Sequence, residues 1–210
     1  MEDLLELIDN KNLLGFTELW ENQKNDFDEA ERQEFLKEVI AFHYDEKQFP
    51  FFQKVLDMIM GDDPNLNFHI EHWAPTFLSL AVHVVSATLF DYLLSKGADI
   101  NFIGDPYAFE DDEYIRTELK IEDRRYATCL DFAILKFSEM MNSDYNYQRP
   151  DWTGIDAPWA EIEPAEEITV SKRYYTYIIE QSQYLYELIH LNRLVTHIRE
   201  MGGETYQELQ

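Results

Sequence analysis

The sequence predicts an all-α fold in which helix pairs stack side by side as a helical-repeat solenoid. Glycine and proline number only seven each, and strand-like alternation of apolar and polar residues is rare, so helices dominate. Apolar residues make up 45% of the 210 residues, which is enough for one domain with a substantial core. Two segments also align without a gap at a fixed spacing, as expected of a repeat architecture.

The first elements along the chain are short amphipathic helices. Residues 1–30 are predicted to form a helical cap, because Leu4 and Ile8 recur at helical spacing on one face. Asp28 then suits a helix N-cap, since its carboxylate can accept a hydrogen bond from the first turn of the next helix. That helix opens a degenerate repeat over 31–67, in which a second amphipathic helix follows.

The repeat period comes from two segments with similar endings, KVLDMIMGDDPNLN and TLFDYLLSKGADIN. They end at Asn67 and Asn101, so the offset between them is 34 residues. In the second copy, Gly97 suits the left-handed turn that ends a helix. Asp99 and Asn101 follow, and their side chains can bond to nearby backbone groups as the chain leaves the helix extended.

Residues 76–101, TFLSLAVHVVSATLFDYLLSKGADIN, resemble an ankyrin repeat along their whole length. Thr76, Leu78 and Ala81 match the family pattern TPLHxA, and LLSKGADIN matches the second helix and exit turn of the family. The resemblance implies antiparallel helix pairs with hairpin-like loops on one side, each pair burying its apolar face on its neighbours. Val85 stands where the family has a glycine between the helices, so the turn there is expected to differ.

A further copy of the repeat is interrupted. Its opening, TCLDFA at 128–133, is similar to the start of the clear repeat, and its closing half is similar to 194–209. About 53 residues are inserted between the two halves. The sequence therefore predicts an interrupted C-terminal repeat over 128–209, with a large irregular insertion at about 138–176.

A second insertion replaces the short loop between repeats at 102–127. From Tyr114 to Ile121 two sets of residues alternate along the chain. One set is mostly charged (Tyr114, Arg116, Glu118, Lys120) and the other is mostly apolar (Ile115, Thr117, Leu119, Ile121). This period of two predicts a long β-hairpin-like extension. Insertions of this length are uncommon in compact domains unless they serve a function. They are interpreted either as binding elements or as segments that pack on the solenoid itself.

The ankyrin resemblance implies that a partner binds to loop tips and to the start of the first helix of each pair, and at the junction of the two helices. Aromatic residues in the insertions are also suited to anchor an interface, although they could instead cover the chain's own core. The predicted protein-binding residues are Glu71, His72, Trp73, Phe77, Val85, Ser86, Tyr107, Phe109 and Tyr114.

Candidate catalytic and metal-binding groups are few. His69, Glu71 and His72 lie in HIEHW, but side chains alternate between the two sides of a hairpin, so no metal site is predicted there. Cys129 has no second thiol to pair with and is expected in the core. No glycine-rich phosphate loop occurs either. We therefore predict a protein that is not an enzyme and has no cofactor.

The charge of the chain is strongly negative, with 17 Lys plus Arg against 42 Asp plus Glu, a formal charge of −25 and a pI near 4.4. Such a field repels nucleic acid and anionic lipid and speeds encounter with basic proteins. The predicted partner is therefore another, basic protein. The acidic N-terminus is unlike a secretory signal, and no apolar run of about 18 residues occurs, so a cytoplasmic location and no membrane contact are expected.

The sequence thus predicts a non-catalytic protein–protein interaction module, with a monomer favoured and the oligomeric state open. One alternative is an inhibitor or immunity-type protein that neutralises a basic toxin or nuclease. The other is a metal-dependent enzyme whose site lies in the insertions and uses His69 or His72.

Overall fold

All regular structure in the described part of the chain is helical, as the sequence predicts. The computed structural model describes residues 1–62, 64–68, 70, 76–104, 128–142 and 187–210. Its elements are α1 (Glu2–Asp9), α2 (Leu13–Gln23), α3 (Glu29–Glu38), the π-helix η1 (Val39–His43), the 3₁₀ turn η2 (Glu46–Gln48), α4 (Phe49–Met60), α5 (Phe77–His83), α6 (Ala87–Ser95), α8 (Cys129–Asn142) and a final helix over 187–200.

The two predicted insertions fall mainly outside the described residues. The β-hairpin-like extension predicted at 102–127 lies outside them from residue 105 onward and stays a prediction. The irregular insertion is predicted to begin at residue 138, but α8 continues as a helix to Asn142. The remainder of that insertion also lies outside the described residues.

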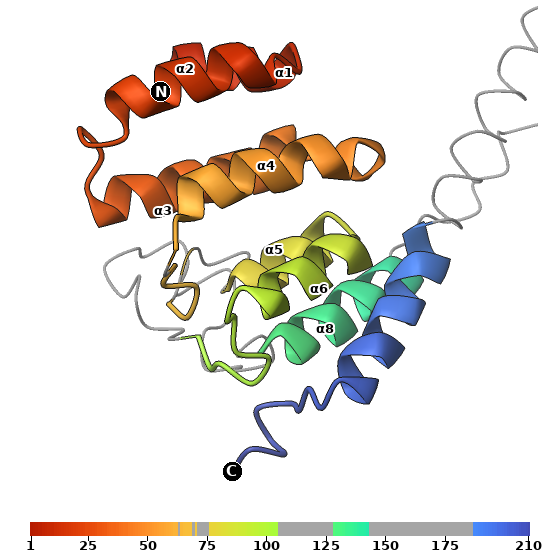
Figure 1. Cartoon of the computed structure of the whole chain (residues 1–210). Helices are drawn as coiled ribbons and strands as arrows, with labels where there is room; N and C mark the ends of the chain where they lie inside the picture. The colour runs from red at the N-terminus through yellow and green to blue at the C-terminus, as the bar shows by residue number, and fades with distance from the viewer. Residues whose placement is uncertain (63, 69, 71–75, 105–127, 143–186) are drawn as a thin grey trace, which may run out of the picture.

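The helices follow one another as pairs in four layers, from α1 and α2 at the top of Figure 1 to α8 and the final helix at the bottom. The first helices of the pairs form one row, because α1 contacts η1, η1 contacts α5, and α5 contacts α8. The second helices continue beside them, and α2 contacts α4. Each layer therefore covers the apolar face of the next.

Side-chain caps fix where the helices begin. Asp28 confirms its predicted role, because its side chain accepts from the backbone N–H of Glu31 over 2.9 Å while the Glu31 carboxylate accepts from the Asp28 N–H over 2.9 Å. Thr76 caps α5 and Ser86 caps α6 in the same way, each accepting from the backbone N–H three residues later. These polar residues sit between apolar runs and so divide the chain into short helices.

Two glycines end the second helices of the last two layers. Gly97 has φ 95° after α6 and Gly202 has φ 90° after the final helix, a conformation that side chains with a Cβ rarely adopt. The residue after each glycine donates its N–H to the carbonyl five residues earlier, over 3.1 Å after α6 and 2.8 Å after the final helix. The predicted helix end at Gly97 is therefore confirmed, and it is repeated at Gly202.

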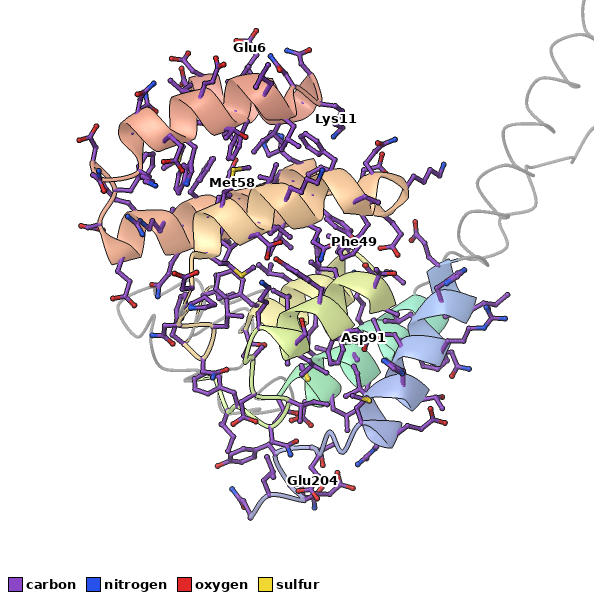
Figure 2. The ribbon with its side chains drawn as sticks, viewed as in Figure 1. Glu6, Lys11, Phe49, Met58, Asp91 and Glu204 are labelled. Carbon is purple, nitrogen blue, oxygen red and sulfur yellow. The ribbon has the colours of Figure 1, made fainter. Side chains whose placement is uncertain are left out.

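Contacts between layers are formed largely by buried aromatic side chains. In Figure 2, Met58 lies between α2 and α4, where its carbonyl accepts from Trp20 Nε1 over 3.1 Å. Phe49 at the start of α4 meets Tyr92 of α6 edge to face, with ring centroids 5.7 Å apart. No helix among the described residues has the length and apolar character needed to cross a bilayer.

Candidate functional site

Most of the predicted binding residues cannot be placed. Those that lie outside the described residues are Glu71, His72, Trp73, Tyr107, Phe109 and Tyr114. Phe77, Val85 and Ser86 are described, and all three belong to the pair formed by α5 and α6.

Phe77 and Ser86 are buried, with 0% and 1% of their surface exposed. The Phe77 ring meets Phe68 edge to face at 5.4 Å, and Ser86 Oγ accepts from the N–H of Leu89 over 2.9 Å at the start of α6. The structure thus gives these two residues packing and capping roles. A partner could contact them only if the layers moved apart.

Val85 occupies the turn between α5 and α6 with φ 55°. A β-branched residue in the left-handed region is strained, and the ankyrin pattern has glycine at this position. The turn nevertheless has the hydrogen bond of a helix end, since the Ser86 N–H donates to the Ala81 carbonyl over 3.0 Å. Val85 in place of glycine therefore adds backbone strain to this turn, but the hydrogen bond of the turn is kept.

Cys129 is a core residue, as predicted. It is 2% exposed, and its Sγ lies 3.3 Å from the carbonyl oxygen of Ile100. Burial, with a smaller contribution from Asp131, raises the pKa of the Cys129 thiol to about 12. The thiolate that nucleophilic chemistry needs is therefore scarce at neutral pH.

No three His, Cys, Asp or Glu side chains within the described ranges are grouped closely enough to hold a metal ion. His69 and His72, the metal ligands of the alternative interpretation, lie outside those ranges.

Asn67 joins the second layer to the third. Its Nδ2 donates to the carbonyl of Gly97 over 3.2 Å, and its Oδ1 accepts from the N–H of Asp99 over 2.7 Å. One amide side chain thus bonds to both sides of the glycine turn that ends α6. An amide suits this position because it supplies one donor and one acceptor.

Asn101 repeats this arrangement one layer later. Its Nδ2 donates to the carbonyl of Gly202 over 3.2 Å, and its Oδ1 accepts from the N–H of Glu204 over 2.8 Å. Glu204 is labelled at the bottom of Figure 2, beyond the final helix. The two asparagines that define the 34-residue offset therefore make equivalent contacts to the next helix pair.

A second set of equivalent contacts joins the second helices. Asp57 of α4 accepts from Tyr92 Oη over 2.8 Å and pairs with Lys96 Nζ at 2.5 Å. Asp91, which is offset from Asp57 by the same 34 residues, lies 2.6 Å from His197 Nε2 of the final helix (Figure 2). The sequence carries a signal for this series, because Asp57 and Asp91 occupy the same position in the aligned segments KVLDMIMGDDPNLN and TLFDYLLSKGADIN.

Glu46 gathers three hydroxyl groups near the turn between α5 and α6. Its carboxylate accepts from Tyr44 Oη over 2.6 Å, from Thr88 Oγ1 over 2.5 Å and from Ser86 Oγ. Burial alone would raise the pKa of the Glu46 carboxyl, but these hydrogen bonds outweigh it and lower the pKa. The cluster links the second layer to the start of α6.

A groove of about 840 Å³ lies where α3 and the end of α4 meet the segment at 64–67. Its lining residues are Phe27, Glu29, Arg32, Gln33, Leu36, Ile59, Met60, Pro64, Asn65, Leu66, Asn67, Lys96 and Gly97. Arg32 Nη2 donates to the Lys24 carbonyl over 2.6 Å, while its Nε is buried without a hydrogen-bond partner. Sequence reasoning missed this site because its walls come from two helix pairs and from the segments at Phe27 and 64–67.

Comparisons with known proteins give no relative of this chain: no protein-family model matches it, and neither does any curated protein or solved structure. The features that bear on function are the charge, the repeated contacts between layers, and the groove.

Proposed function

We propose that this chain is an ankyrin-like repeat protein that binds another protein and catalyses no reaction. The contacts of Asn67 and Asn101 support the repeat assignment, because equivalent residues bind the glycine turn of the following pair. Thr76 and Thr128 add to this support, because each hydroxyl accepts a hydrogen bond from the backbone N–H three residues later, within the similar segments TFLSLA and TCLDFA. In such arrays each pair contacts only its neighbours, so long edges stay available to a partner.

The net charge of −25 is the observation that favours a basic partner. Carboxylates such as Glu2, Glu6 and Glu18 are exposed on the first two helices, and Glu6 points away from the stack in Figure 2. A surface of one sign accelerates encounter with a surface of the opposite sign and repels phosphate backbones. The partner class is therefore a basic protein, with no nucleic acid and no membrane.

Two observations on the described residues bear on the proposed absence of catalysis. Cys129 is buried with a raised pKa, and the described His, Asp and Glu side chains form no cluster of three that could hold a metal. The interactions that these groups do make, such as Asp91 with His197, join one helix pair to the next. These side chains therefore hold neighbouring helix pairs together.

Salt dependence of binding tests the basic-partner proposal. The chain is immobilised, proteins retained from native cytosol are identified, and the association rate of each purified candidate is measured at about 0.05 M and about 0.5 M salt. The proposal expects proteins of pI above about 9, with association slowed roughly tenfold or more at the higher salt. A partner whose association is unchanged by salt would contradict it.

Loop aromatics are proposed to supply affinity once the partner is bound. Trp73→Ala and Tyr114→Ala are expected to accelerate dissociation of that partner without changing the helical circular dichroism signal. Leu14→Ala is a control, because Leu14 is 71% exposed on α2 and lies outside the predicted binding loops. Unchanged dissociation in both aromatic variants would remove these loops from the binding surface.

An inhibitor of a basic nuclease or toxin is the form of this function that the charge favours most directly. Such an inhibitor covers a cationic active site with carboxylates that stand in for phosphates. It is tested by adding the chain to purified basic nucleases and measuring turnover of a nucleic-acid substrate. Inhibition that weakens as salt increases supports this form, and unaffected turnover leaves the binding module as the proposed function.

A further inference from the structure

Phe42 is an exposed aromatic side chain on the π-helix η1. Its surface is 67% exposed, whereas Val39 and Ile40 of the same short helix are fully buried. A single exposed apolar side chain is ordinary in itself. The backbone beneath this one is not, because π-helices are rare and are often found at functional sites. The ring is therefore a candidate anchor for another molecule.

The exposed ring lies in the more acidic part of the described chain. Residues 1–62 contain 16 Asp and Glu against six Lys and Arg, whereas residues 76–104 contain two against one. A second copy of the chain would meet this part with the same negative sign, so the charge opposes self-association there. A partner of opposite sign is favoured instead, and the segment that faces Phe42 is expected to bring positive charge.

Glu38 is the carboxylate available beside the ring. It is partly exposed and lies four residues before Phe42, and residues four apart share one side of a helix. Its side chain has no hydrogen bond or ion pair with any described residue. The nearby acids Asp9 and Glu46 are already occupied, by His43 Nδ1 at 2.6 Å and by three hydroxyl groups. Glu38 is thus free to accept from a partner.

Two lysines lie close to this site in the sequence. Lys37 is 7% exposed and pairs with Glu34 at 2.6 Å, so its charge is matched within α3. Lys47 is exposed on η2, five residues beyond Phe42. The two residues directly before Lys47 are acidic, so this turn keeps a negative charge. Neither lysine therefore reverses the sign of the surface around the ring.

A cation already lies on an aromatic ring near the end of α1. Lys11, labelled in Figure 2, places its Nζ 4.4 Å from the ring centroid of Phe52. The exposed ring of Phe42 has no cation or second ring on it among the described residues. An arginine suits this position best, because a guanidinium stacks on an aromatic face and pairs with a carboxylate in the same pose.

We propose that Phe42 and Glu38 form a docking site for an arginine of the basic partner. The guanidinium stacks on the Phe42 ring and pairs with the Glu38 carboxylate. The proposal rests on the proposed function, because it names the residue type by which the partner is held. It adds a site on described helices to the loop residues predicted from the sequence.

Titration of the full chain with short peptides tests the site. The probes are acetyl-Gly-Arg-Gly-Arg-Gly-amide and its lysine twin, which has the same charge but no planar guanidinium. The chain is isotope-labelled, and its backbone amide signals are followed by NMR at about 0.1 M salt. The signals of residues 41–43 are expected to shift most, and the arginine peptide should bind about threefold tighter than the lysine peptide.

Variants of the chain locate the effect. Phe42→Leu keeps an apolar side chain but removes the ring, so the two peptides should bind with nearly equal affinity. Glu38→Gln should weaken the arginine peptide about threefold, because it removes the charged acceptor at a partly exposed site. Leu14→Ala and Glu200→Gln are the matched controls, since Leu14 is 71% exposed on another helix and Glu200 is an exposed carboxylate of the last pair. Neither control should change either affinity.

Equal affinity of the two peptides for the parent chain, a preference that survives Phe42→Leu, or shifts spread evenly over the acidic helices would overturn the proposal. So would a change in sedimentation of the chain alone on Phe42→Leu, because it would show that a second copy covers the ring. The peptides are tested without the partner, so a failure of this site leaves salt-sensitive capture of a basic protein as a separate result. Failure of capture likewise leaves the peptide result in place.

Discussion

The junction between the second and third helix pairs and the junction between the third and fourth share the same framework but differ in what fills it. Both are bridged by an asparagine, Asn67 in one and Asn101 in the other, that binds the next glycine turn. Both also have an aspartate, Asp57 or Asp91, that contacts the next second helix. The same kinds of polar contact therefore occur at both of these junctions.

The two junctions differ in the other side chains that pack between the helix pairs. Position 77 is a fully buried phenylalanine, whereas the equivalent position in the next pair is Cys129. The Glu46 cluster adds hydrogen bonds at the first of the two junctions. The asparagine and aspartate contacts are therefore alike at the two junctions, whereas the packing that stabilises each junction differs.

The largest expected effect is on stability, and it compares a buried packing residue from each of the two junctions. Phe77→Ala should lower the free energy of unfolding by about 3–5 kcal/mol, because it opens a cavity beside Phe68. Cys129→Ala should lower it by only about 1 kcal/mol, since a much smaller group is removed. Urea denaturation followed by circular dichroism measures both. Equal losses would show that the two junctions are packed alike.

The next effect tests whether the bridging asparagines are equivalent. Asn67→Ala and Asn101→Ala should each cost about 1–2 kcal/mol, because each removes one donated and one accepted hydrogen bond at a partly exposed site. The matched control is Asn22→Ala on α2, whose side chain bonds only within its own helix. A loss at one junction alone would mean that the repeated contacts are not equivalent in energy.

A smaller effect concerns Glu46, whose cluster of hydroxyl groups lies at the earlier junction. Glu46→Gln should cost about 0.5–1 kcal/mol at neutral pH, a modest value because the residue is exposed and its carboxylate is screened by water. Its pKa is lower in the folded chain than its ordinary value of 4.5. The carboxylate therefore stabilises the fold above about pH 4.5, and this contribution is lost as the pH falls through the lowered pKa.

Comparing the parent chain with Glu46→Gln at pH 7 and at acid pH checks the sign of this dependence. The stability gap between them should narrow as the pH falls. Glu2→Gln, at an exposed residue of α1, should give a gap that changes little. A gap for Glu46→Gln that widens in acid would show that the hydrogen bonds do not outweigh burial.

The smallest effect concerns the turn inside the third pair. Val85 and Val84 are both partly buried neighbours, but only Val85 has a positive φ, 55°. Val85→Gly should therefore be less destabilising than Val84→Gly by about 1 kcal/mol, because relief of backbone strain offsets the lost packing. The thermal midpoints of the two variants measure this difference. If Val85→Gly proved the more harmful, the turn would carry no strain.

Local features of the fold could be predicted from the sequence because they depend on neighbouring residues. Asp28 as a cap and Gly97 as a helix end are set by contacts or conformations within a few positions. The 34-residue offset of the asparagines could be found by aligning two segments of the sequence. The helical class follows from the spacing of apolar residues. The β-hairpin-like extension and the loop residues of the binding surface stay predictions, since they lie outside the described residues.

What only the tertiary structure decided is which of these side chains face a neighbouring layer. Phe77 and Ser86 look like accessible loop-end residues in the sequence, yet the second pair packs over them. The contacts of Asp57 with Tyr92 and of Asp91 with His197, and the groove around Arg32, join residues that are far apart in the chain. No local sequence pattern specifies such long-range contacts, because they depend on the rotation and spacing at which whole helix pairs pack.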